Sequence, residues 1–301
     1  MEEEKRLEQK KPLVSVVIPC YNHAQFVQES IQSVIDQDYD NIELIIIDDG
    51  SKDNSVEVIQ QMIPACEERF VRFEFRYRPN NGLCATLNEA LEWCRGEYFS
   101  PLASDDVLIS QKVKDQIEKL SLLGKEYVGV FGSAQKIDSH GNVLGVLNLK
   151  NSSIYHFLDI YFHKHNLPAC TQMLRTNEVR KVGGYSEEYR IEDWYMWLKL
   201  TQNNKYLVSM PCVFSQYRTH SSNTSSNTNL MHEERIKIMN SEVWGVSNKE
   251  KSLAFSMCCL STSIESTGFI SKFKFILKSI FNDIRVLRER KLYISLYKLF
   301  L

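Results

Sequence analysis

The sequence lacks the features of several protein classes. Glycine and proline are few, 12 and 7 in 301 residues, and Lys and Arg (36) do not outnumber Asp and Glu (38). A net charge of −2 argues against a protein that wraps nucleic acid, because binding the phosphate backbone requires a basic face. No run approaches the roughly 18 apolar residues of a membrane span. Residues 1–11 are rich in Glu and Lys and lack the apolar core of a signal peptide. We therefore expect a protein without a signal peptide that is soluble or peripheral to a membrane.

The eight cysteines include no C-x-x-C pair. They fall where small apolar residues would also fit, which is typical of reduced structural thiols in a reducing compartment. A cytoplasmic protein is therefore expected. The cysteines are Cys20, Cys66, Cys84, Cys94, Cys170, Cys212, Cys258 and Cys259.

Short apolar runs alternate with amphipathic segments over the first hundred or so residues. This alternation predicts a mostly parallel, Rossmann-like sheet flanked by helices. Ligands of such sheets bind beyond the carboxyl ends of the strands. The expected strands are 14–18, 42–47, 71–77 and 98–102, and the expected helices are 25–37, a segment carrying Val56, Ile59 and Ile63, and 83–94. Further on, the pattern predicts a helix at 113–122, a strand at 127–131 and a hairpin turn at 139–142.

Two polar clusters follow the first two expected strands. Pro19-Cys20-Tyr21-Asn22 places an aromatic ring where it can stack on a base, although a tyrosine at a loop corner also satisfies this pattern. Asp48-Asp49-Gly50-Ser51 carries two adjacent carboxylates, one of which can accept a hydrogen bond from a base N–H. The alternative for this second cluster is a helix cap.

Two more acidic clusters stand further along the chain. Ser104-Asp105-Asp106 follows the fourth expected strand, and adjacent carboxylates there favour a hard divalent cation that bridges a diphosphate. The alternative is that Asp106 caps a turn. Glu192-Asp193-Trp194 begins a helix, where an ionised carboxylate can deprotonate a sugar hydroxyl while the indole stacks on the ring. A plain helix cap explains these two acids almost as well.

In combination, these motifs resemble family 2 glycosyltransferases with the GT-A fold. The resemblance runs from about Leu13 to Asn223 and is best in four segments: VSVVIPCYNHAQFVQESIQSVIDQDYDNIELIIIDDGSKDNS, NNGLCATLNEAL, ASDD and VGGYSEEYRIEDWYMWLKL. It implies an α/β GT-A domain at residues 13–225, after a charged tail at 1–12 and before a helical extension at 226–301.

The resemblance also implies roles for single residues. Tyr21 and Asp49 would hold uracil with Pro19 at its edge, and Asn81 and Gly82, near Arg78, would lie under the base and ribose. Asp105 would face the ribose and phosphate, and Asp106 would bind Mn²⁺ or Mg²⁺. Asp193 would be the catalytic base, with Glu192 and Trp194 beside the acceptor. Arg218 or His220, in a segment that closes over the donor in relatives, would reach the diphosphate or the metal; the alternative is a solvated loop.

The chain departs from the family pattern at one place. Many relatives have D-x-D-D where this chain has Ala103-Ser104-Asp105-Asp106, so the first carboxylate is missing, although some members carry a similar S/T-D-D sequence. The Q-x-x-R-W element of processive synthases does not follow Trp197. We therefore expect an enzyme that adds a single sugar.

The C-terminal segment, Phe269–Leu301, interleaves Phe, Ile and Leu with basic residues. This pattern predicts amphipathic helices that lie on anionic lipid; the alternative is packing against the catalytic domain with a solvated basic rim. The basic residues are Lys272, Lys274, Lys278, Arg285, Arg288, Arg290, Lys291 and Lys298.

The sequence as a whole predicts an inverting hexosyltransferase. The expected donor is a UDP-sugar, with UDP-glucose or UDP-galactose favoured. The expected acceptor is an undecaprenyl-diphosphate-linked GlcNAc or GalNAc, at the cytoplasmic face of a bacterial plasma membrane, in O-antigen or capsule synthesis. The alternatives are a catalytically degenerate nucleotide-sugar-binding protein and a nucleotide-sugar pyrophosphorylase, which would want a glycine-rich loop after the first strand. A dehydrogenase is excluded because no G-x-G-x-x-G follows an early strand.

Overall fold

A computed structural model describes residues 11–147, 151–220, 223 and 227–300. It comprises two compact units. Unit 1 takes its described residues from Met1–Ile154, Leu167–Glu187 and Lys199–His220, and unit 2 from Tyr155–Asn166, Glu188–Leu198 and Ser221–Leu301. The predicted domain boundaries at residues 12 and 225 stay predictions, since most of the residues around them lie outside the described ranges.

Unit 1 is built on a sheet with ten strands among the described residues. The strands lie in the order β3 (Arg72–Tyr77), β2 (Ile42–Asp48), β1 (Val14–Cys20), β4 (Tyr98–Pro101), β9 (Met173–Arg175), β6 (Tyr127–Ile137), β10 (Tyr206–Arg218) and β5 (Val107–Leu108), while β7 (Val143–Leu147) pairs with β6 and β8 (Ser153–Tyr155) with β10. The first four are parallel to one another, as are β6 and β10, whereas β9 runs antiparallel to both neighbours. The predicted α/β class is confirmed.

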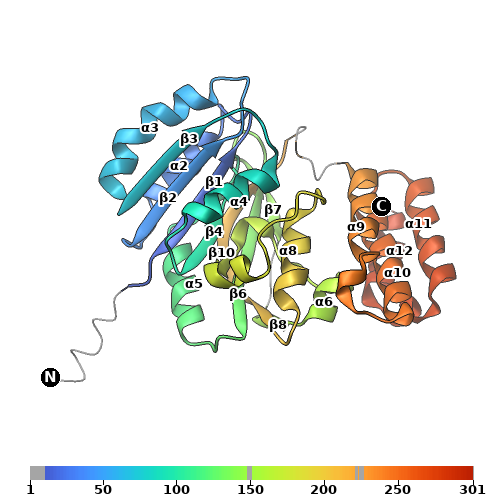
Figure 1. The fold of residues 1–301 in the computed structure, drawn as a ribbon. Coiled ribbons are helices and arrows are strands. Elements are labelled where there is room, and N and C mark those ends of the chain that lie inside the picture. Colours follow the sequence, from blue (N-terminus) through green and yellow to red (C-terminus); the bar gives the residue numbers. More distant parts are fainter. Residues whose placement is uncertain (1–10, 148–150, 221–222, 224–226, 301) are drawn as a thin grey trace. The chain divides into compact units, whose positions relative to one another are not determined.

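Helices cover both faces of the parallel part of this sheet (Figure 1). Apolar residues of α2 (Val27–Ile35), α3 (Ser55–Arg69) and α5 (Lys112–Ser121) share one core cluster with alternate residues of β1 and β2, such as Val16 and Leu44. Helix α4 (Leu83–Trp93) packs on β1 and β2 from the other face. A strand buried on both faces is mostly apolar, and all seven residues of β2 are buried. Glu43, a charged residue inside this run, is paired with Arg72 of β3 at 2.8 Å.

Strand β1 lies between β2 and β4 and is parallel to both. The strands β2 and β3 lie on one side of β1 and β4 on the other, so the order of the strands reverses at β1. The carboxyl ends of these parallel strands meet at one edge, where α/β proteins bind their ligands. The loops that follow β1, β2, β3 and β4 therefore all leave from this edge. Elsewhere in unit 1, the predicted hairpin is confirmed as the turn between β6 and β7, and α7 (Thr176–Lys181) follows the 3-10 helix η1 (Ala169–Thr171) and β9.

Unit 2 is helical. It contains α6 (Phe157–Tyr161), most of α8 (Glu192–Thr201), α9 (Thr228–Met239), η3 (Glu242–Trp244), α10 (Asn248–Glu265), α11 (Phe269–Asn282), η4 (Ile284–Arg288) and α12 (Arg290–Leu299). Helix α10 begins with a capping box between Ser247 and Glu250. It shares a core with the three later elements, made by Leu253, Met257, Leu260, Ile276, Val286, Leu292 and Leu299. The expected C-terminal helical extension is thus confirmed, and none of the described helices combines the length and apolarity needed to cross a membrane.

Candidate functional site

Hydrogen bonds join the loops at the carboxyl edge of the sheet in unit 1. The N–H of Asn22, after β1, donates to Ser51 Oγ, after β2, at 2.8 Å, and the next residue, His23, donates its N–H to Ser55 Oγ at 3.0 Å. The His23 ring bonds through Nδ1 to Ser104 Oγ, after β4, at 2.8 Å. Three of the predicted clusters therefore lie together. Beside them Tyr21 is 46% exposed, and Pro19 is a partly buried residue of β1.

The buried carboxylate of Asp49 organises the loop that follows β3. Its Oδ1 accepts the Asn81 N–H at 2.8 Å and pairs with the Arg78 guanidinium, and its Oδ2 accepts the Gly82 N–H at 2.9 Å. Arg78 also pairs with Glu89 of α4 at 2.7 Å. The structure thus brings the predicted residues Asp49, Arg78, Asn81 and Gly82 into one group.

A glycine after Asp49 is required by geometry. Gly50 has φ +77, and a Cβ built there would lie 2.6 Å from the backbone N of Asn80. A side chain at this position would therefore both strain its own backbone and push on the loop that Asp49 holds. The Asp-Asp-Gly-Ser motif is consequently a packing requirement as well as a source of carboxylates.

Asp105 and Asp106 are both buried, and they make different contacts. Asp106 Oδ1 accepts the backbone N–H of Arg218 at 2.8 Å. Burial, and then the neighbouring Asp105, raise the pKa of Asp106 well above its usual range. Asp105 Oδ2 lies 2.9 Å from His220 Nε2. Two buried carboxylates in sequence are costly unless a positive partner is close.

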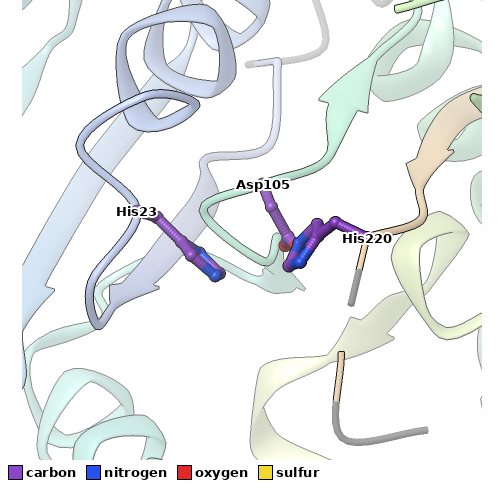
Figure 2. A group of neighbouring side chains, drawn as sticks. All are labelled: His23, Asp105 and His220. Atoms are coloured by element: carbon purple, nitrogen blue, oxygen red, sulfur yellow. The ribbon is translucent and has the colours of Figure 1, made fainter. Parts of the chain in front are cut away.

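Among the described residues, the group that could hold a metal ion is His23, Asp105 and His220 (Figure 2). Their ligand atoms all lie within 4.8 Å of one another. His220 was a sequence candidate and Asp105 was expected on the ribose and phosphate, whereas the sequence analysis assigned no role to His23. The signal that could have identified it is an imidazole two residues beyond Tyr21, in a loop already expected to face the ligand.

Arg218 is the largest fully buried side chain of the described residues, and its guanidinium is bound by the protein. It donates to Asp105 O at 2.8 Å, to Asp138 O at 3.2 Å and to Glu29 at 2.5 Å. It also lies 4.9 Å from the centre of the Phe26 ring, which stacks on the His220 ring at 5.1 Å. In this structure Arg218 braces the Asp105–Asp106 turn and the strand end that carries His220.

Glu192, Asp193 and Trp194 form the first turn of α8 in unit 2. Asp193 Oδ1 accepts the Trp194 N–H at 2.6 Å. Burial raises the pKa of Asp193, and burial followed by the neighbouring Asp193 raises the pKa of Glu192 to about 8. The Trp194 indole is 3% exposed, donates to Ile160 O at 3.0 Å and stacks on His163 at 4.2 Å. Stacking of this indole on a sugar, as predicted, would require that packing to open.

Comparison with known proteins identifies the family. Residues 15–182 match the model described as glycosyl transferase family 2. The chain belongs to this family. An uncharacterized glycosyltransferase of Rickettsia typhi is 31% identical over 192 residues, which are 62% of this chain and 58% of that protein. One of Rickettsia conorii is 30% identical over 197 residues, 62% of this chain and 31% of that protein. The chain thus spans less than two thirds of the length of these family 2 relatives.

The family 2 domain has relatives of more specific description as well. A putative teichuronic acid biosynthesis glycosyltransferase of Bacillus subtilis is 36% identical over 108 residues, 36% of this chain and 42% of that protein. Among solved structures, S. aureus TarS 1-349 in complex with UDP-GlcNAc has a TM-score of 0.65 at 16% identity, covering 95% of this chain and 88% of that chain. The mannosyltransferase PcManGT of Pyrobaculum calidifontis, in complex with GDP-Man and Mn²⁺, has a TM-score of 0.60 at 12% identity, covering 99% and 93%. The expected GT-A fold is confirmed.

Proposed function

We propose that this protein is an inverting, non-processive hexosyltransferase. It moves a hexose from a UDP-sugar, with UDP-glucose or UDP-galactose favoured, to a hydroxyl of a lipid-diphosphate-linked GlcNAc or GalNAc in O-antigen or capsule synthesis. One observation carries this proposal. At the carboxyl edge of unit 1, hydrogen bonds connect the loops that hold the Asp49 group with the loops that hold His23 and Asp105, and His220 lies beside these two residues. Domain 13–225 would carry this activity.

The Asp49 group fits the nucleoside of the donor. A carboxylate oxygen can accept two hydrogen bonds, so Asp49 Oδ2 can hold the Gly82 N–H and a uracil N–H together. The exposed ring of Tyr21 offers a face for the base, with Pro19 at its edge. Asn81 and Gly82, fixed by Asp49, would line the ribose.

The donor set of His23, Asp105 and His220 fits a divalent ion, Mn²⁺ or Mg²⁺. Metal–ligand bonds of about 2.1–2.2 Å allow ligand atoms up to about 4.4 Å apart, so atoms within 4.8 Å need only a small contraction. A bound ion would offset the negative charge on the diphosphate oxygens of the leaving UDP. The grouping favours Asp105 as the carboxylate on the ion, with Asp106 held on the Arg218 N–H beside it.

Asp193 is the proposed catalytic base. Burial raises its pKa, and a general base takes up a proton more effectively as its pKa comes closer to the operating pH. It would take the proton of the acceptor hydroxyl as the oxygen attacks the anomeric carbon from the side opposite UDP. One displacement inverts that carbon and yields a β-linkage from an α-linked donor.

The C-terminal helices fit an anionic membrane surface, where a lipid-linked acceptor resides. Residues 269–300 carry eight basic and two acidic side chains, and both acids are paired, Asp283 with Arg285 and Glu289 with Lys164. Exposed apolar side chains on such a segment mark a contact surface, and like charge disfavours a second copy as its partner. They are Phe269, Ile270, Phe273, Leu277, Phe281, Ile284, Leu287, Tyr293, Ile294, Tyr297 and Phe300. These features support the proposal that the protein works on the cytoplasmic face of the plasma membrane.

A donor screen tests the function. The full chain is incubated with Mn²⁺, a synthetic GlcNAc- or GalNAc-diphosphate-lipid and each of several UDP-sugars, and the anomeric configuration of any product is determined by NMR. We expect β-linked product with one UDP-hexose and one sugar added per acceptor. Binding of UDP-sugars without transfer or hydrolysis would support the degenerate binding protein instead, and formation of UDP-sugar from UTP and a sugar phosphate would support the pyrophosphorylase.

A further inference from the structure

His23 is held in place more firmly than a loop residue needs to be. Its carbonyl oxygen accepts the N–H groups of Phe26 and Val27, each at 2.9 Å, at the start of α2. Its own N–H donates to Ser55 Oγ at 3.0 Å, and the preceding Asn22 adopts φ +56 to turn the chain toward it. The backbone of His23 is thus fixed by two helices that follow different strands.

The imidazole of His23 is oriented as well as placed. The ring bonds through Nδ1 to the buried Ser104 Oγ at 2.8 Å. When Nδ1 donates this bond, Nε2 carries the lone pair, which is the arrangement that second-shell partners impose on histidines that bind metals. The polar atom that orients the ring comes from the residue directly before Asp105.

The partner imidazole, His220, is fixed independently at the end of β10. Its face stacks on Phe26 at 5.1 Å, and its ring meets the His23 ring edge to face at 5.7 Å and 84°. Three chain segments, which follow β1, β4 and β10, therefore each supply one ligand atom to the same small volume. A structural hydrogen bond between His23 and Ser104 alone would not require this convergence.

We propose that His23 is a nitrogen ligand of the donor-site ion, and that the paired imidazoles of His23 and His220 make this site select Mn²⁺ over Mg²⁺. Mg²⁺ prefers six oxygen ligands, whereas imidazole suits transition metals and Mn²⁺ also accepts the carboxylate of Asp105. The inference rests on the proposed function, since the ion is the one that the UDP-sugar would meet. It adds a ligand and a metal preference to that function.

Pulsed electron paramagnetic resonance of bound Mn²⁺ tests this without using activity. The full chain with Mn²⁺ alone, and with Mn²⁺ and UDP, should show coupling to two imidazole nitrogens. Uniform ¹⁵N-histidine in the wild-type protein should convert both couplings, so this measurement needs no variant. His23→Gln should keep one coupled nitrogen, bind Mn²⁺ about tenfold more weakly or worse, and let Mg²⁺ compete more effectively. His140→Gln, an exposed histidine of unit 1, is the matched control and should match the wild type.

The results separate this inference from the proposed transferase. Unchanged nitrogen coupling and Mn²⁺ affinity in His23→Gln would overturn the assignment of His23 as a ligand. Equal affinity of the wild-type protein for Mn²⁺ and Mg²⁺ would overturn the metal preference. Either result would hold even if sugar transfer is observed. Mn²⁺ bound through both histidines in a protein that consumes no nucleotide sugar would leave the ion site standing and refute the transferase.

Discussion

The carboxylate of Asp49, directly after β2, accepts the backbone N–H of Asn81 at 2.8 Å. This bond fixes the loop after β3 from the end of the neighbouring strand. A residue expected to bind the donor is thus also the residue that shapes the donor site around it, so the two roles must be tested together.

Asp49→Asn should weaken UDP binding about tenfold or more. The amide keeps the size of the side chain, but it removes the ion pair with Arg78 and replaces an acceptor oxygen by a donor, and hydrogen bonds to charged groups are worth roughly 1.5–3 kcal/mol each. Isothermal titration calorimetry with UDP and Mn²⁺ measures this. Asp36→Asn is the control, because Asp36 is an exposed aspartate directly after α2. Equal UDP affinities of the two variants would contradict the prediction.

Gly50→Ala should reduce donor binding and stability, whereas Gly141→Ala should reduce stability alone. Both glycines have positive φ, so both substitutions strain the backbone by roughly 1–3 kcal/mol. Only the Cβ at Gly50 meets another backbone, at 2.6 Å from Asn80 N, while nothing lies within 4 Å of the Cβ at Gly141. Thermal melting and UDP titration of the two variants separate strain from collision. The explanation fails if both lose UDP binding alike.

Asp193→Asn should lower turnover by roughly 10² or more and leave UDP-sugar binding nearly intact, because only proton removal is lost. The neutral amide should not lower stability, since burial already disfavours the ionised form of Asp193. Single-turnover kinetics with the preferred donor measure the change. Glu233→Gln, which changes an exposed acid of α9 in unit 2, is the control, and near-normal turnover of Asp193→Asn would exclude Asp193 as the base.

Replacing both Ile270 and Phe281 by Ser should reduce sedimentation with anionic vesicles about tenfold or more. These side chains are 83% and 85% exposed on α11, and transferring one large apolar side chain out of water is worth roughly 1.5–3 kcal/mol. Leu122→Ser, an exposed leucine of unit 1, is the control. Vesicles of phosphatidylglycerol and phosphatidylcholine serve as the anionic probe. Vesicles of pure phosphatidylcholine, which carry no net charge, show how much of the binding depends on lipid charge. Equal pelleting of both variants would remove the lipid assignment.

Lys112→Met should change the pH dependence of stability. The Lys112 ammonium is fully buried, 2.7 Å from Ser100 Oγ, and burial lowers its pKa to about 7. Between pH 7 and the unfolded pKa of about 10.4 the unfolded chain holds a proton that the folded chain lacks, so raising the pH favours the folded state. The melting temperature of the wild type should therefore rise relative to that of the Met variant from pH 7 to pH 10. A constant difference would show that Lys112 does not titrate in this range.

The sequence by itself determined the four parallel strands β1 to β4 and the polar loops that follow them. The runs 14–18 and 42–47 lie within β1 and β2, because strands buried on both faces are mostly apolar. The carboxyl ends of parallel strands share one edge of the sheet. Asp49 and Asn81 each follow a predicted parallel strand, and this is enough to place them near each other.

Only the tertiary structure decided which atoms of that edge meet. It grouped His23 with Asp105 and His220. Asp105 lies 82 positions after His23, and His220 lies 115 positions after Asp105, so the three meet only through strand pairing that no local pattern encodes. The Arg218 guanidinium donates to Asp105, Asp138 and Glu29 in the structure, whereas the sequence suggested that Arg218 reaches the diphosphate. The direction of a polar side chain depends on the partners that long-range packing brings to it, and those partners are set by the whole fold.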